Sequence, residues 1–193
     1  MKFKKLFATI GVGFGLIASA HAGLVGVKTI EVTNAIGIWL QVAEVVALDM
    51  GATNVALSSN GATASAPDWW SSISMPGKAI DGNTAGNYGL GQIFHEGSPF
   101  TNDTLTITLA SIAELDSIQI FGRTDCCSDR DVYAVTFRDE TGVDLYSTRL
   151  DARGTNHNDS EVLPDTSVPE PASLALVGIS LLGLAASRRI RRT

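Results

Sequence analysis

Two arginines and both cysteines of the chain lie within the single stretch Arg123-Thr-Asp-Cys-Cys-Ser-Asp-Arg130. Each guanidinium group presents a rigid fork of hydrogen-bond donors, which suits the hydroxyl groups of a neutral ligand such as a sugar. The alternative is that each arginine forms a surface ion pair with one of the many carboxylates of the chain. Because both arginines fall within one eight-residue motif, we interpret the stretch as part of a binding site.

Cys126 and Cys127 are the two cysteines of the chain, and an exported protein is expected to pair them. Adjacent Cα atoms lie about 3.8 Å apart, whereas ordinary disulfides span about 4.4–6.8 Å. A bridge between neighbours also closes almost no loop. Such a disulfide would add little to the stability of the fold. It makes better sense as a group that presents a rigid apolar surface. Two free thiols, a redox switch and an intermolecular bridge are the alternatives.

A second stretch, Gly77 to Tyr88, carries the oxygen chemistry that calcium prefers. Asp81 and Asn83 flank a glycine in an Asp-Gly-Asn turn, and carboxylate, amide and carbonyl oxygens are the usual ligands of Ca²⁺. Taken alone, the same tripeptide is an ordinary turn. The motifs on either side of it favour the calcium site.

These motifs follow one another in a fixed order along the chain. Asn54-Val-Ala-Leu57 precedes the calcium loop, and His95 and then Arg123-x-Asp125-x4-Arg130 follow it. This succession resembles the F-type lectins (fucolectins), within the galactose-binding-like, discoidin-type superfamily, whose motif is a histidine, a spacer and Arg-x-Asp-x4-Arg. The spacer after His95 holds 27 residues, one more than is usual in the family, and a surface loop can absorb the extra residue.

The resemblance implies an all-β fold, an antiparallel jelly-roll β-sandwich, with a calcium-supported site for a fucose-like sugar. In the family the pair of adjacent cysteines packs against the sugar. Asp125 has two possible roles, in contact with ligand or in orienting an arginine. The carbohydrate-binding residues implied here are His95, Arg123, Asp125, Cys126, Cys127 and Arg130, with Tyr88 as a further candidate.

The same resemblance implies calcium ligands. They are the Lys78 carbonyl, Asp81, Asn83 and a residue aligned with Gln92, where the family usually has a serine. The family's other ligands come from a late Ala-Glu-Val-type strand. We expect none after Asp151, but Trp39-Leu-Gln-Val-Ala-Glu-Val-Val46 carries that pattern near the start. We therefore infer a rearranged strand order in which the closing strand pair comes first and the Ala43 carbonyl and Glu44 complete the calcium shell.

The first 22 residues are typical of a secretory signal peptide. Lys2, Lys4 and Lys5 precede an apolar run, and Ala20-His21-Ala22 supplies a small-x-small cleavage pattern. The mature chain is therefore expected to begin at Gly23. A transmembrane anchor is the alternative, but the run is short for spanning a bilayer.

The last 26 residues, 168–193, resemble the PEP-CTERM sorting signal of Gram-negative bacteria. Val168-Pro169-Glu170-Pro171 precedes an apolar stretch and a tail with four arginines, and such a basic end stays in the cytoplasm. The resemblance implies an inner-membrane intermediate with a transmembrane helix, which an exosortase then cuts near the motif. A permanent single-span anchor is the alternative.

Between the two signals, every strong periodicity is short and alternates as in a β-strand. The expected strands are 27–33, 40–48, 104–109, 117–121, 132–137 and 143–146, separated by turns rich in Gly, Asn and Asp. This favours a β-sandwich over residues 23–151, followed by a polar linker over 152–167. Trp39, Trp69 and Trp70 either stack on sugar or pack in the core and rim, and packing is the more common role.

Residues 23–167 hold 7 lysine and arginine against 19 aspartate and glutamate residues, a formal net charge of −12. Such an acidic domain repels phosphate backbones, so nucleic acid is not an expected partner. No Ser-His-Asp order, HExxH helix or phosphate loop is present in the sequence, and we expect no enzyme activity.

The sequence therefore predicts an exported, calcium-supported carbohydrate-binding module that prefers a fucose-like sugar. It would be displayed at the cell surface or in the extracellular polysaccharide of a Gram-negative bacterium. Its expected partners are glycans or exopolysaccharide, an exosortase as processing enzyme and, transiently, the inner membrane. The alternative is a structural or adhesion matrix protein with the same sandwich and no sugar binding.

Overall fold

A computed structural model describes residues 22–98 and 103–166. The strands within these residues are β1 (Leu24–Asn34), β2 (Gln41–Val42), β3 (Glu44–Asp49), β4 (Thr63–Ser65), β5 (Phe94–His95), β6 (Leu105–Phe121), β7 (Val132–Arg138), β8 (Asp144–Asp151) and β9 (Asn158–Val162). The 3-10 helices are η1 (Ser58–Asn60), η2 (Pro76–Ile80), η3 (Tyr88–Leu90) and η4 (Ser128–Arg130). The predicted all-β class is confirmed for the described residues.

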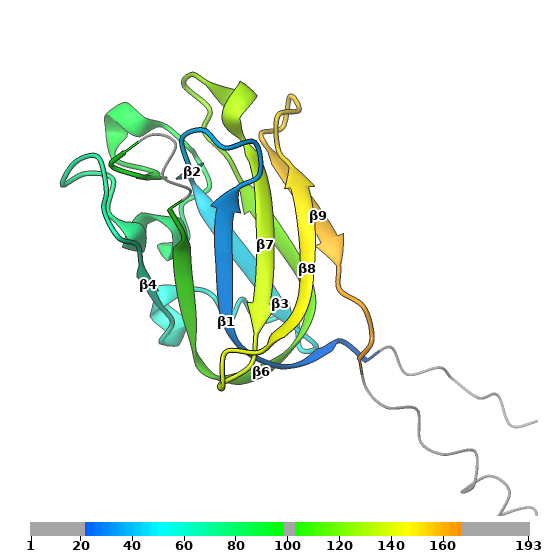
Figure 1. The fold of residues 1–193 in the computed structure, drawn as a ribbon. Coiled ribbons are helices and arrows are strands. Elements are labelled where there is room, and N and C mark those ends of the chain that lie inside the picture. The colour runs from blue at the N-terminus through cyan, green and yellow to red at the C-terminus, as the bar shows by residue number, and fades with distance from the viewer. Residues whose placement is uncertain (1–21, 99–102, 167–193) are drawn as a thin grey trace, which may run out of the picture.

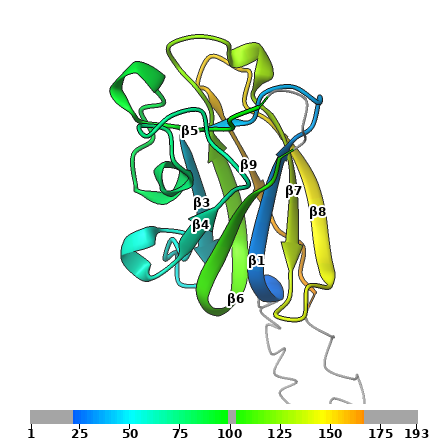
Figure 2. The ribbon, with the colours of Figure 1, turned by 60° about the vertical axis from the view of Figure 1, so that its left-hand side comes forward.

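Strand β6 joins the two halves of the sheet structure. Its first part pairs with β1 and β4, and its last part lies between β3 and β9. On the other side of β1 the order continues through β7 to β8, and every pairing is antiparallel. Figures 1 and 2 show β1, β7 and β8 on one side of the domain, with β3 and the end of β6 behind them.

Two expected strands, 104–109 and 117–121, are parts of this one 17-residue strand. The residues between them have no strict alternation, which is why the sequence pattern divides them. They nevertheless stay paired with β1, because register shifts between Leu24 and Val27 and between Val27 and Thr29 accommodate the irregularity. Bulges of this kind bend and twist a strand without ending it.

One hydrophobic core fills the domain, and the alternating strands supply it. Burial of these apolar side chains is the main favourable contribution to folding. The largest fully buried side chains include Tyr133, Phe94, Phe137, Leu24, Ile30 and Leu40.

The two ranges predicted as a closing strand pair, 27–33 and 40–48, do not form a pair with each other. The range 40–48 is divided at Ala43, whose N–H donates to the Phe121 carbonyl at 2.8 Å. Strands β1 and β3 do not pair with each other, because each pairs with a different part of β6. The rearranged strand order stays a prediction, and the structure adds a strand after Asp151, β9.

The prediction of a linker over 152–167 is wrong for most of its length. Strand β9 pairs with Ser117–Phe121 of β6, and both Ala152 and Leu163 are buried. The Leu163 N–H donates to the Asp116 carbonyl at 2.7 Å. The polar composition misled the prediction, because β9 is a short strand with no fully buried side chain of its own. Exposed polar residues are usual on such strands.

Replacing Leu163 by alanine tests whether this segment belongs to the domain. The side chain is 1% exposed and lies in the core, so we expect the free energy of unfolding to fall by about 2 kcal/mol or more. Val162→Ala is the matched control, since Val162 is 65% exposed and its loss should change stability by less than about 0.5 kcal/mol. Urea unfolding measures both. If both substitutions change the free energy of unfolding by less than about 0.5 kcal/mol, Leu163 does not contribute to the core and the segment is a linker.

The two ends of the described domain lie side by side. The Thr166 N–H donates to the Gly23 carbonyl at 3.3 Å, and the Val25 N–H donates to the Thr166 hydroxyl at 3.0 Å. Both chain ends leave the domain at this point, at the end of the sandwich opposite the loops around β2 and β5 (Figures 1 and 2).

Candidate functional site

At the loop end of the sandwich, six side chains from several segments surround a cavity of about 240 Å³. Four of them are candidates from the sequence motif, and two are tryptophans. The cavity is lined by Trp39, Trp70, Tyr88, His95, Arg123 and Arg130. The fold thus brings the histidine, both arginines and the tyrosine of the predicted site to one place.

His95 lies on β5, which pairs with β2 so that His95 is opposite Gln41. Its Nδ1 is 2.8 Å from the Glu96 carbonyl oxygen. Since a carbonyl oxygen only accepts, Nδ1 carries the hydrogen, and Nε2 is left as an acceptor in the neutral ring. Burial holds the pKa of His95 below its usual value, and the charges of Arg123 and Arg130 act in the same direction. The lowered pKa favours the neutral form of His95.

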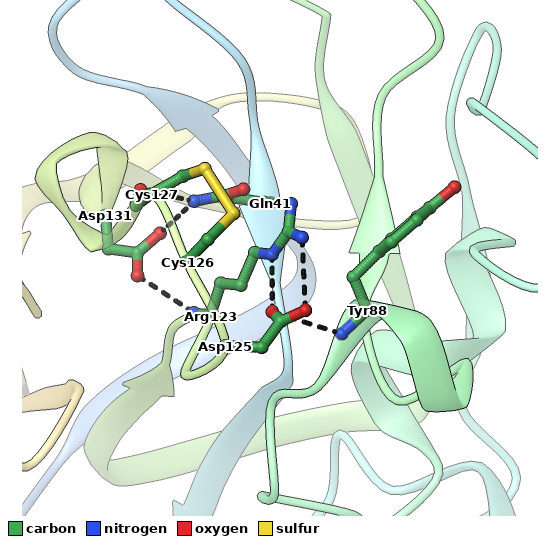
Figure 3. The surroundings of a disulfide bond; sticks show 7 residues. All are labelled: Gln41, Tyr88, Arg123, Asp125, Cys126, Cys127 and Asp131. Atoms are coloured by element: carbon green, nitrogen blue, oxygen red, sulfur yellow. Dashed lines mark hydrogen bonds and ion pairs between the residues drawn. A yellow bond between two sulfur atoms is a disulfide. The ribbon is translucent and has the colours of Figure 1, made fainter.

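Arg123 is held in place by Asp125. The Arg123 Nε and Nη2 atoms donate to the two carboxylate oxygens at 2.6 and 3.2 Å (Figure 3). Asp125 also accepts a hydrogen bond from the Tyr88 N–H at 3.3 Å, and the hydrogen bond from Arg123 lowers the pKa of Asp125. Asp125 is not among the residues lining the cavity. Of the two roles considered from the sequence, the geometry favours orientation of Arg123.

The end of the predicted calcium loop, Gly77 to Tyr88, docks against the arginine motif. The Thr124 N–H donates to the Gly86 carbonyl at 2.9 Å, and Gly86 has a φ of +73°. A Cβ atom at this position would lie 2.6 Å from the Gly122 carbonyl oxygen, so only glycine allows this approach. The contact brings Tyr88 beside Arg123, whose guanidinium carbon is 4.9 Å from the centre of the tyrosine ring. A cation over an aromatic face is a favourable pair.

Aromatic rings form the rest of the wall. Trp39 and Trp70 meet edge to face with ring centres 5.3 Å apart, and the His95 ring is 5.1 Å from Trp39 and 5.7 Å from Tyr88. The sequence favoured packing in the core or at the rim as the role of these tryptophans. Trp70 is 56% exposed, packs against Trp39 and also lines the cavity, so packing and ligand contact are both open to it. The adjacent Trp69-Trp70 pair in a turn-rich segment was the signal that could have identified it.

The two cysteines form a disulfide next to this cavity, at the turn before η4 (Figure 3). Cys126 is exposed and Cys127 is half-buried, and neither lines the cavity. Cys127 has a φ of +60°, and its carbonyl oxygen accepts a hydrogen bond from Gln41 Nε2 at 2.8 Å. The disulfide lies close to Arg123 (Figure 3) but outside the cavity lining.

A buried polar network under the disulfide was not predicted. Gln41 Nε2 also donates to Asp131 at 3.0 Å, and the other Asp131 oxygen accepts from the Arg123 N–H at 2.8 Å (Figure 3). The Tyr133 hydroxyl donates to the Gln41 carbonyl at 2.7 Å. Asp131 is fully buried, and burial raises its pKa to about 7. A polar residue inside the apolar run Leu40-Gln41-Val42 was the available sequence signal.

The predicted calcium residues are partly brought together. Glu44 Oε2 accepts a hydrogen bond from the Gly82 N–H at 3.1 Å, inside the Asp81-Gly-Asn83 turn. Glu44 is 1% exposed, and its Oε1 atom has no hydrogen-bond partner among the described residues. Burial raises the pKa of Glu44 to about 7, and repulsion from Asp81 adds to this. A buried carboxylate with an unpartnered oxygen, near a second carboxylate, fits a divalent cation.

The other predicted ligands have local contacts. Asp81 accepts from the Asn83 N–H at 3.0 Å and faces the Lys78 ammonium at 3.4 Å, and the Asn83 side chain accepts from the Ala85 N–H at 3.0 Å. Gln92 Oε1 accepts from the Asn87 N–H at 3.3 Å. Within the described ranges, no three His, Cys, Asp or Glu side chains gather as a metal site. A calcium shell at Glu44 would therefore depend on amide and carbonyl oxygens.

Glu96, the neighbour of His95, is a third buried carboxylate. It is fully buried, and neither of its oxygens has a hydrogen-bond partner in the part of the chain that the structure describes. Burial raises the pKa of Glu96 to about 7, and the charges of Asp103 and Asp68 add to this. The folded domain therefore keeps a proton on Glu96 over a pH range in which the unfolded chain has released it.

From this we predict that stability falls as the pH rises from about 5 to 8. Asp131, whose pKa is likewise raised, contributes with the same sign. Glu96→Gln should remove part of the decline, on the order of 1 kcal/mol between the ends of the range. Urea unfolding at pH 5.5 and 8, with calcium present, measures it. Glu140→Gln, at an exposed position, is the control, and equal pH profiles for the two variants would contradict the prediction.

Comparison with known proteins identifies the C-terminal signal. Residues 167–192 match the family model of the PEP-CTERM protein-sorting motif. The match indicates an exported protein that a membrane-associated exosortase processes on its way to the cell surface. The sorting motif Val168-Pro169-Glu170-Pro171, the predicted transmembrane helix and nearly all of the predicted signal peptide lie outside the described residues.

No curated protein and no solved structure matches the chain. The similarity to known proteins covers the sorting signal and does not extend to the domain that carries the cavity. Among the residues with a described structure, no helix has the length and apolar character needed to cross a membrane.

Proposed function

We propose that this domain is a lectin module that binds a neutral, fucose-like sugar, on a galactose-binding-like jelly-roll sandwich. One observation carries the proposal: a neutral histidine, two arginines and three further aromatic rings surround a single cavity of about 240 Å³. Cavities for drug-sized ligands are commonly about 300–1,000 Å³. The smaller volume is suited to a single sugar ring.

Each group in the cavity has a part in this proposal. The Nε2 atom of His95 accepts a hydrogen bond from a sugar hydroxyl, and Arg123 and Arg130 donate to hydroxyl oxygens. Asp125 keeps the Arg123 fork in one orientation, which reduces the entropy lost on binding. The aromatic rings contact the apolar face of the sugar, and the Cys126–Cys127 disulfide supplies an apolar rim.

Calcium is proposed as a structural support of the same site. Glu44, Asp81, Asn83 and the carbonyl groups of Ala43 and Lys78 would hold it, with Gln92 as a further candidate. When bound, Ca²⁺ would neutralise Glu44 and Asp81 and fix the turn that leads to Tyr88. The sugar itself is bound by His95 and the arginines.

The proposal includes no catalysis. The cavity wall offers two guanidinium groups, an imidazole and aromatic rings, and its lining residues include no carboxylate and no serine or cysteine nucleophile. Glycans or exopolysaccharide outside the cell are the proposed ligands. A matrix protein that keeps the sandwich without sugar affinity is the outcome to be distinguished from this.

A glycan array probed with the mature chain, with calcium and with a chelator, tests the proposal. We expect binding to fucose-terminated glycans, stronger when calcium is present. Isothermal titration with methyl α-L-fucoside gives the affinity of the single site. A folded domain that binds no glycan under either condition would replace the lectin proposal with the matrix-protein alternative.

A further inference from the structure

A second and larger cavity, of about 550 Å³, lies between β4 and η2. Its walls are mostly apolar and include Ala64, Ala66, Met75 and Pro76. Trp69 is the largest lining side chain, and it is 44% exposed, as Met75 is at 45%. Exposed apolar surface around a concavity marks an interaction site more often than a scattered surface residue does.

Consecutive tryptophans line the two cavities. Trp69 belongs to the wall of the larger cavity, and Trp70 belongs to the wall of the cavity at Arg123. The backbone of these two residues therefore separates the cavities. This short stretch is fixed on the β5 side, because the Trp70 N–H donates to the His95 carbonyl at 2.9 Å and Asp68 accepts from the Gly97 N–H at 2.8 Å.

The two charged groups at the larger cavity lie together. Lys78 and Asp81 both line it, and their side chains are 3.4 Å apart. An exposed indole offers a flat apolar face to the C–H groups of a sugar ring, while the Lys78 ammonium offers a donor to its hydroxyls. The strongly acidic domain favours a neutral ligand over a polyanion.

We propose that the larger cavity is a second saccharide subsite, which takes the residues that follow the terminal sugar bound at Arg123. This inference rests on the proposed function, because the chain it accommodates is the continuation of that sugar. The ligand of the whole site is then a neutral oligosaccharide that passes over the Trp69-Trp70 backbone from one cavity to the other. One of its sugar rings stacks on the Trp69 indole. Affinity then rises with the length of the glycan, as contacts in the second subsite add to those in the first.

Isothermal titration with three ligands tests this subsite. They are methyl α-L-fucoside, a fucose-terminated neutral tetrasaccharide and octyl α-L-fucoside. The wild-type domain should bind the tetrasaccharide at least tenfold more tightly than the methyl glycoside. Trp69→Ala should abolish this gain and leave the affinity for the methyl glycoside within about twofold. Met75→Ala should reduce the gain in part.

Leu90→Ala is the control, since Leu90 is 72% exposed and lines neither cavity. It should leave all three affinities unchanged. The subsite is overturned if Trp69→Ala weakens neither ligand or weakens both equally, or if the octyl chain gives the larger gain. If the wild-type domain binds none of the three ligands, the proposed function fails as well, which separates that failure from the loss of the subsite alone.

Discussion

Replacing Arg123 by alanine is expected to lower the affinity for methyl α-L-fucoside by on the order of 10- to 100-fold, since a hydrogen bond to a charged group contributes roughly 1.5–3 kcal/mol. The substitution removes a donor fork from the cavity and the cation over Tyr88. It also leaves the Asp125 carboxylate without its 2.6 Å partner. Isothermal titration measures the change, and circular dichroism checks that the fold is intact.

Arg153→Ala is the matched control for this experiment. Arg153 forms the same kind of forked pair with Asp151, two residues away, but it is 47% exposed and lies outside the Arg123 cavity. Its loss should leave affinity within about twofold of wild type. Arg123→Lys keeps the charge without the fork, so we expect at least a tenfold loss there. Binding that survives Arg123→Ala would exclude this cavity as the sugar site.

The second large effect is on calcium. The wild-type domain should melt at a higher temperature in calcium than in a chelator, since a ligand at 100 to 1,000 times its dissociation constant stabilises by about 3–4 kcal/mol. Glu44→Gln should abolish most of this rise. The substitution removes the buried carboxylate whose Oε1 atom lacks a partner among the described residues, and an amide is a weaker calcium ligand than a carboxylate.

Asp144→Asn is the control for Glu44→Gln, because it removes a carboxylate from an exposed position. Thermal unfolding of both variants, with calcium and with a chelator, gives the comparison. The calcium-dependent rise should persist in Asp144→Asn. If the calcium-dependent rise in melting temperature is equally large in Glu44→Gln, Glu44 is not a calcium ligand. The inferred ligand set from the early strand would then lack its carboxylate.

The fold class could be read from the sequence because alternation reports which face of a strand is buried. The ranges 27–33 and 132–137 correspond closely to β1 and β7. The pattern failed where burial does not alternate. The middle of β6 has consecutive half-buried and exposed residues, and β9 buries none of its side chains fully. Both segments are strands because they pair with neighbouring strands. The residue pattern of a single segment does not report that pairing.

Part of the candidate site was also accessible from the sequence. The spacing of His95, Arg123 and Arg130 picked out three of the residues that line one cavity. Trp39 and Trp70 were ambiguous, because a tryptophan in a sandwich packs more often than it binds. The support under Arg123, from Gln41 on β2 and Asp131, comes from segments 90 residues apart in the chain. Only the tertiary fold brings such groups together.

The two ends of the described domain are adjacent, because Gly23 and Val25 both form hydrogen bonds with Thr166. In the described domain, the loop end that carries the Arg123 cavity lies opposite the point where the chain ends leave the domain (Figure 1). Under the proposed function, copies attached to one surface through their C-terminal segments would carry their cavities on the far side from the attachment point. Under the proposed function, avidity from this array allows firm attachment even where each single contact is weak.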